Sequence, residues 1–122
     1  MKARQGSQND LVKDARSYLE AHSAEKFSLQ TMAGALFVNG SYLLRTFRHH
    51  TGMTLLHCHH LIRCEKAGEL LTRTDQSVSE IGEAVGYVSS SHFTHVFKIM
   101  MGCTPSEYRR LHGGEEKEGE EP

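Results

Sequence analysis

Two stretches of the chain repeat one pattern of residues, and this repeat limits the possible folds more than any other feature. Residues 28–54, SLQTMAGALFVNGSYLLRTFRHHTGMT, align with residues 77–104, SVSEIGEAVGYVSSSHFTHVFKIMMGCT. The alignment begins with an offset of 49 residues and ends with an offset of 50, so the second copy has one extra residue in its middle. The repeat indicates two copies of one supersecondary unit.

Each copy has the signals of two short helices with a turn between them. In the second copy, Ser77 and Glu80 form the S-x-x-E pattern that starts many helices. Gly86 lies where a left-handed residue ends the first helix, and Gly102 ends the second. Apolar residues recur at helical spacing, which predicts a buried face on both helices. They are Val78, Ile81, Ala84, Val85, Phe93, Val96, Phe97, Met100 and Met101.

The rest of the chain adds further helices and no convincing strand pattern. Residues 9–22 and 54–73 have helical periodicity, and the second of these segments joins the two copies. A last helix is predicted to open at Thr104, with Pro105 in its first turn. The sequence therefore predicts an all-α fold of seven helices. The expected boundaries are about 28–52 for the first helix-turn-helix unit, 54–73 for the joining helix and 77–102 for the second unit.

Composition and charge narrow the class of protein. The chain has 122 residues with 38% hydrophobic and 24% charged residues, which is ordinary for a globular domain. Its three cysteines are odd in number and form no C-x-x-C pattern, so we expect no disulfide framework and a reducing cytoplasm. Five glutamates gather in residues 115–122, and we expect residues 113–122 to form an acidic, disordered tail.

A helix-turn-helix unit places the outer face of its second helix in the major groove of DNA. Small polar and basic side chains suit that face because they fit closely and hydrogen-bond to base edges. The residues expected to contact bases from these faces are Gly40, Ser41, Leu44, Arg45, Ser90, Ser91, Thr94 and His95. Arg48, His49 and Lys98 are expected to contact phosphates. Arg109 is a candidate phosphate contact, or alternatively a charge favoured by the helix dipole.

The length of the joining helix bears on how both copies would meet DNA. A helix of about 20 residues is roughly 30 Å long, close to the roughly 34 Å of one DNA turn. We therefore expect the two recognition helices to enter successive major grooves of one duplex.

The second copy carries a recognisable spaced signature. Its parts are Ile81-Gly82-Glu83-Ala84-Val85-Gly86-Tyr87, Ser91-His92-Phe93, Val96-Phe97-Lys98, Gly102, Thr104-Pro105 and Tyr108-Arg109. With this signature, residues 8–112 resemble the DNA-binding domain of the AraC/XylS family of bacterial transcription regulators. Phe37 and Leu44 depart from that family, which usually has glycine and a polar residue at these positions. His59 stands where an apolar residue is common in the family, and Cys58 and Cys64 replace larger core groups.

The resemblance implies sequence-specific binding of double-stranded DNA, and usually activation of transcription through contact with RNA polymerase. It implies no cofactor in this domain. The family usually carries an effector-binding domain ahead of the DNA-binding one, so an effector would act only through such a sensor domain. Residues 1–122 are accordingly either a stand-alone regulator or, as we expect, the C-terminal part of a longer one.

Two other functions stay open from the sequence. One is a helical protein–protein interaction module without DNA binding, which the net charge of −1 allows. The other is a metal sensor that uses His57, His60 and Cys64, which fall on one helical stripe and suit zinc. No nucleophile–base pair or glycine-rich phosphate loop is present in the sequence, so we do not expect an enzyme.

Overall fold

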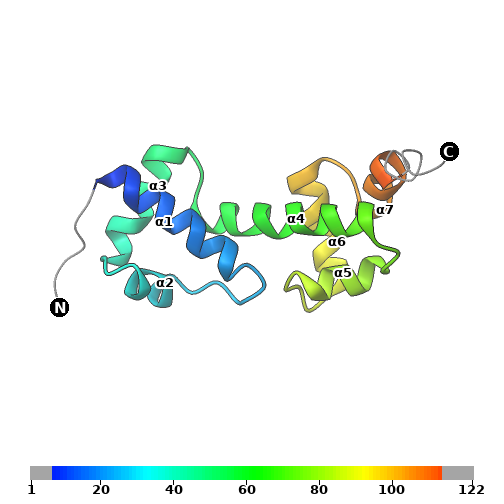
Figure 1. The fold of residues 1–122 in the computed structure, drawn as a ribbon, viewed down its shortest axis with the longest axis horizontal. Coiled ribbons are helices and arrows are strands. Elements are labelled where there is room, and N and C mark those ends of the chain that lie inside the picture. Colours follow the sequence, from blue (N-terminus) through cyan, green and yellow to red (C-terminus); the bar gives the residue numbers. More distant parts are fainter. Residues whose placement is uncertain (1–6, 114–122) are drawn as a thin grey trace. The chain divides into compact units, whose positions relative to one another are not determined.

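The computed structural model describes residues 7–113, and these residues form helices joined by short turns, without any strand (Figure 1). The elements, in chain order, are α1 (Gln8–Ala21), α2 (Leu29–Ala35), α3 (Gly40–Thr51), α4 (Leu55–Arg73), α5 (Val78–Ala84), α6 (Ser90–Met101), α7 (Pro105–Tyr108) and a π-helical turn, η1 (Arg109–Gly113). The predicted all-α fold of seven helices is confirmed. Gly113, which was expected to begin the tail, belongs to η1, and the rest of that tail lies outside the described residues.

Side-chain caps explain where the helices begin. Ser77 accepts a hydrogen bond from the backbone N–H of Glu80, whose carboxylate accepts one from the Ser77 N–H in return. Thr104 and Glu107 make the same reciprocal pair at the start of α7. Each cap satisfies backbone N–H groups that lack a partner within the helix. Both capping boxes that the sequence contains at these sites are therefore formed.

Left-handed residues explain where several helices end. Gly52 and Gly102 close α3 and α6 with φ angles of 79° and 86°. Gly86 follows α5 with a φ angle of 111°, as its position in the sequence predicts. Because glycine has no Cβ, it adopts these angles without the steric cost that other residues meet.

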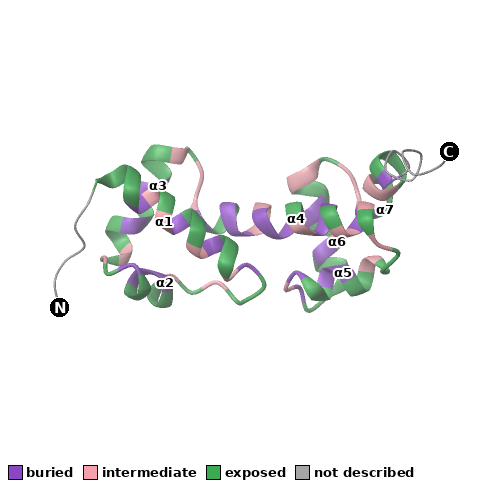
Figure 2. Cartoon of the chain, in the orientation of Figure 1, coloured by how far each residue is buried: buried purple, intermediate pink, exposed green. Residues whose placement is uncertain are grey.

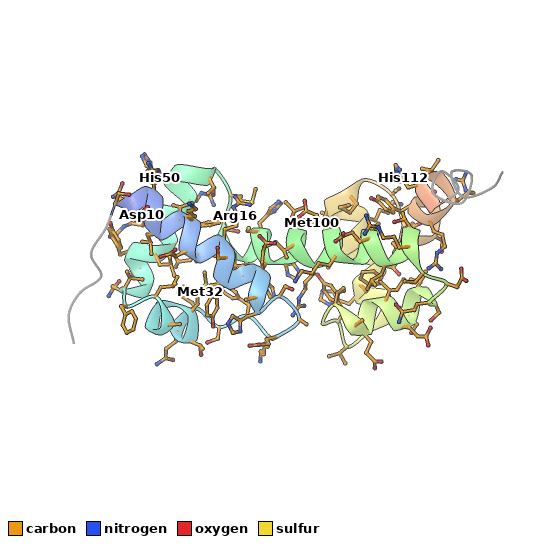
Figure 3. The ribbon with its side chains drawn as sticks, viewed as in Figure 1. Asp10, Arg16, Met32, His50, Met100 and His112 are labelled. Atoms are coloured by element: carbon orange, nitrogen blue, oxygen red, sulfur yellow. The ribbon has the colours of Figure 1, made fainter. Side chains whose placement is uncertain are left out.

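The chain divides into two compact units, of which the first ends at His59. In the first unit, α1 packs against α3, and α2 also packs against α3 (Figure 1). Its interior is made of apolar side chains from α1, α2, α3 and the first turns of α4. They are Leu11, Ala15, Leu19, Met32, Ala33, Leu36, Leu43, Phe47, Leu55 and Cys58. Figure 3 labels Met32, which comes from α2 and is fully buried.

The second unit begins at His60 and is built around α6, which packs against α5 and α7. One cluster of buried residues joins the later turns of α4 to α5 and α6 (Figure 2). Its members are Cys64, Ala67, Leu71, Ile81, Val85, Tyr87, Phe93, Val96 and Phe97.

Four expectations for this core need correction, and the first is Val78, which is half-buried. Met100 and Met101 lie in the last turn of α6, and they are half-buried at the edge of this core. Ala84 is exposed, whereas Gly82 takes the buried position on α5, where the helix approaches Phe93.

None of the helices formed by residues 7–113 is both long and apolar enough to cross a membrane.

Candidate nucleic-acid interface

The buried face of α3 determines which of its residues point outward. Leu43, Thr46 and Phe47 are buried in the first unit. Since successive residues of a helix are about 100° apart, positions 41, 44, 45 and 48 lie on the opposite side. Ser41, Leu44, Arg45 and Arg48 are indeed exposed there, and so is His49.

Gly40 differs from the other predicted base contacts of α3. It is half-buried at the start of the helix, and a Cβ built on it would lie 3.4 Å from Leu29 Cδ2. Its position therefore faces Leu29 of α2, at an ordinary van der Waals distance. Base contact by Gly40 stays a prediction, and it is one that only the backbone of this residue could make.

The second unit has a similar outer face on α6. Phe93, Val96 and Phe97 are buried, while the predicted contacts lie on the other side of the helix. Among these predicted contacts, Ser90, Ser91, His95 and Lys98 are exposed, and Thr94 is half-buried. The structure thus brings the predicted residues of each unit together on one outer helix face.

A surface hollow of about 580 Å³ lies beside the outer face of α3. Its lining residues come from α1 and α3 and include three basic side chains. They are Gln8, Tyr42, Arg45, Thr46, Arg48 and His49. Two guanidinium groups and an imidazole around one hollow suit an anion such as a phosphate group.

The sequence alone did not identify Gln8 and His50 as part of this region. Gln8 lies at the start of α1, and its amide oxygen Oε1 lies 2.9 Å from His50 Nε2. The same amide donates a hydrogen bond of 3.5 Å to the Tyr42 hydroxyl. Figure 3 labels His50 near Asp10 at this end of the unit. These contacts join residues more than 30 positions apart, so only the packing of α1 on α3 reveals them.

Arg109 has a structural role that the sequence did not predict. Its Nε donates to the carbonyl oxygen of Leu71 at 2.9 Å, and its Nη2 donates to those of Thr74 and Gln76 at 3.1 and 2.7 Å. These three bonds hold the connection between α4 and α5. They turn the guanidinium toward the protein backbone. For this reason we do not propose Arg109 as a phosphate contact.

Known proteins share this arrangement. The chain matches the family model described as a helix-turn-helix domain over residues 32–111. The C-terminal domain of AraT, a response regulator from Geobacillus stearothermophilus, is 36% identical, with a TM-score of 0.79 over 87% of this chain and 88% of that one. The DNA-binding domain of AdpA, solved with a target DNA, is 25% identical, with a TM-score of 0.72 over 91% and 96% of the two chains. The chain belongs to the AraC-type helix-turn-helix family.

A curated relative adds the context of a longer protein. The transcriptional activator RhaS of an Enterobacter species is 34% identical over 94 residues, which cover 77% of this chain and 34% of the relative. The chain spans about a third of the length of such relatives. The match therefore concerns the AraC-type domain and leaves two thirds of each relative uncompared.

In the second AraC-type unit, Tyr87 connects the turn to α4. Its ring is 4% exposed, and its hydroxyl lies 2.7 Å from His60 Nδ1. The guanidinium carbon of Arg63 lies 4.8 Å from the ring centroid, a cation–π distance. Burial raises the pKa of Tyr87 from 10.0 to about 12, so the phenol stays protonated at neutral pH. These contacts hold the turn that precedes α6.

The same surroundings argue against the metal sensor. Cys64 is fully buried, and burial raises the pKa of its thiol from 9.0 to about 11, so the thiol is protonated at neutral pH. His60 is already engaged with Tyr87. Within residues 7–113, no group of three or more His, Cys, Asp or Glu side chains could hold a metal ion. His57, His60 and Cys64 therefore do not form the predicted site.

Proposed function

We propose that residues 8–112 bind double-stranded DNA sequence-specifically, as the DNA-binding domain of a bacterial transcription regulator. One observation carries the proposal: both α3 and α6 combine a buried apolar face with an outer face of small polar and basic side chains. An outer face of this kind fits the major groove, where side chains must be short or flexible enough to reach base edges. The AraC-type family consists of DNA-binding regulators rather than enzymes, which agrees with this assignment.

The contacts divide between bases and phosphates. Residues on the outer faces of α3 and α6 would meet base edges: Ser41, Leu44, Arg45, Ser90, Ser91, Thr94 and His95. Arg48 and His49 would hold a phosphate group at the hollow beside α3, and Lys98 would hold one beside α6. Arg45 is the strongest candidate for direct readout, because a guanidinium can donate two hydrogen bonds to guanine.

Each unit carries its own recognition helix, so we propose that both contact one duplex in successive major grooves. A footprint that covers two adjacent groove segments would support this proposal, and a footprint limited to one segment would contradict it. The chain is proposed to act in the cytoplasm and to activate transcription through RNA polymerase, since a relative that shares this domain is named an activator. An effector would act through a sensor domain outside this chain.

Selection of binding sites from random duplexes tests the proposal. We expect the chain to enrich one asymmetric sequence, with an affinity that falls steeply as salt concentration rises. If the chain retains duplexes without sequence preference, or binds no DNA at all, a protein–protein interaction module would be favoured instead.

Two variants sharpen the test at one salt concentration. Arg45→Ala is expected to weaken binding to the selected site by about 1–3 kcal/mol, while a scrambled duplex loses less. Lys98→Ala is expected to weaken both duplexes alike and to reduce the salt slope by about one unit. Arg16→Ala is the control, because Arg16 is exposed on α1 and does not line the hollow. Equal losses on both duplexes for Arg45→Ala would make this residue a phosphate contact only.

A further inference from the structure

One leucine lies among the donors of the outer face of α3. Leu44 is 42% exposed, whereas Leu43 and Phe47 of the same helix are fully buried. Ser41 lies three residues before Leu44, and Arg48 lies four residues after it, so the three side chains form one row along the helix. The row therefore offers a hydroxyl, an apolar group and a guanidinium in turn.

Exposure alone would give Leu44 no role, because single apolar residues are common on protein surfaces. Leu56, at the start of α4, is 49% exposed and illustrates this ordinary case. Leu44 differs from it in position: it is adjacent to Arg45, which lines the basic hollow. The matching residue of the second unit is Thr94, which is half-buried and polar. At this position the apolar group is thus found only in the first recognition helix, whereas the exposed Ile99 of α6 matches His49 of α3.

The major groove offers one apolar partner among the base edges, the C5-methyl group of thymine. A leucine side chain can cover this methyl group, and it cannot satisfy the donors and acceptors of the other base edges. Leu44 and Arg45 both lie on the outer face of α3, about 100° apart around the helix, so their side chains diverge toward different base edges. Two neighbouring base pairs can therefore be read by these two residues.

We propose that Leu44 selects a thymine, through its methyl group, at the base pair next to the one that Arg45 reads. This inference rests on the proposed DNA binding and assigns the base preference at one position of the site. It also assigns apolar readout to the first unit, because Thr94 can hydrogen-bond at the matching position of the second.

Deoxyuridine tests the inference, since it differs from thymidine only by the missing methyl group. Each thymine of the selected duplex is replaced in turn, and affinity for the chain of residues 1–122 is measured. At one position we expect binding to weaken about four-fold, which corresponds to ~0.8 kcal/mol for one buried methyl group. With Leu44→Ser, the same replacement should leave the affinity unchanged, because no apolar side chain covers that position.

Leu56→Ser is the matched control and should retain the four-fold effect of deoxyuridine. Leu44→Gln is a second variant at the tested position, and it should lose the effect as Leu44→Ser does. Far-ultraviolet circular dichroism checks that each variant is folded, which we expect because Leu44 makes no part of the core.

Two results would overturn the inference while DNA binding stands. One is a wild-type chain that binds its selected site and tolerates deoxyuridine at every thymine. The other is a deoxyuridine effect of equal size in wild type and Leu44→Ser. A chain that enriches no sequence and shows no salt dependence would overturn both the proposed function and this inference.

Discussion

The two helix-turn-helix units share one backbone plan and fill it with different side chains. In the second unit, Gly82 of α5 faces Phe93 of α6, and a Cβ on Gly82 would lie only 2.8 Å from Phe93 Cδ2. At the matching positions the first unit has Ala33 and Leu43, both of which are buried. A larger residue on one helix thus goes with a smaller one on the other. The comparison shows that packing conserves the volume of the pair rather than either residue.

The turns show a second difference between the units. Both use the same hydrogen-bond pattern, with Val38 N–H donating to Ala33 O at 3.0 Å and Tyr87 N–H donating to Gly82 O at 2.9 Å. The left-handed residue in this pattern is Gly86 in the second unit, but Phe37 in the first, with a φ angle of 60°. Phe37 is also 52% exposed. The first unit therefore maintains a costly backbone conformation without a glycine.

Two departures from ordinary sequence rules lie in the first unit. A strained phenylalanine in its turn and an exposed leucine on its recognition helix both belong to it. Sites that break local rules are often functional, because stability is given up there for another purpose. This agrees with the base readout proposed for Leu44 and Arg45. The second unit has a glycine, Gly86, at the left-handed position of its turn, although it also exposes two apolar residues, Val88 and Ile99.

The largest expected effect comes from the core phenylalanines, which test whether the units are equally dependent on one aromatic residue. Phe47 and Phe97 occupy matching positions and are both fully buried. Phe47→Ala and Phe97→Ala should each lower the free energy of unfolding by about 3–5 kcal/mol. Urea unfolding measures the loss. A loss below about 1 kcal/mol for either variant would mean that its unit does not rely on that side chain.

The pair of Gly82 and Phe93 gives the next largest effect. Gly82→Ala should lower the free energy of unfolding by about 1–3 kcal/mol, because the new Cβ overlaps the Phe93 ring. Adding Phe93→Leu reproduces the pair found in the first unit, and the double variant should be more stable than the sum of the single losses predicts. Strictly additive losses in urea unfolding would show that the two positions do not compensate each other.

Much of the fold could be predicted from the sequence, because the signals that begin and end helices are local. The joining helix was expected at residues 54–73 and extends over Leu55–Arg73. Caps and glycine stops lie within a few residues of the groups that they satisfy, so the sequence reveals them directly. The outward position of Ser41, Leu44 and Arg45 follows from the same helical periodicity.

The rest depended on contacts between distant residues. The bonds of Arg109 to the α4–α5 connection span 33 to 38 positions, and nothing local distinguishes this arginine from a phosphate contact. The contact between Gln8 and His50 spans 42 positions. Such pairs appear only when helices pack, and base and phosphate contacts form only when DNA is bound.

Exchange of the left-handed residues tests the difference between the turns. Phe37→Gly should raise the free energy of unfolding by about 1 kcal/mol, because glycine removes the steric cost of a positive φ angle. Gly86→Ala should lower it by about 1–2 kcal/mol for the opposite reason. Thermal and urea unfolding give both values. If Phe37→Gly is destabilising, contacts of the phenylalanine ring contribute more stability than the backbone strain costs.

The smallest expected effect concerns the caps of the two recognition helices. Asn39 Oδ1 accepts from the backbone N–H groups of Ser41 at 2.8 Å and Tyr42 at 3.2 Å, whereas Ser89 Oγ accepts only from that of His92 at 3.2 Å. Asn39→Ala should therefore cost about 1 kcal/mol and Ser89→Ala about 0.5 kcal/mol. Asn39→Ser, which keeps one acceptor, should lie between wild type and Asn39→Ala. Urea midpoints rank the variants, and amide hydrogen exchange shows whether the loss falls on the first turn of α3. A larger cost for Ser89→Ala would mean that the number of capped N–H groups does not set the stability of these helix starts.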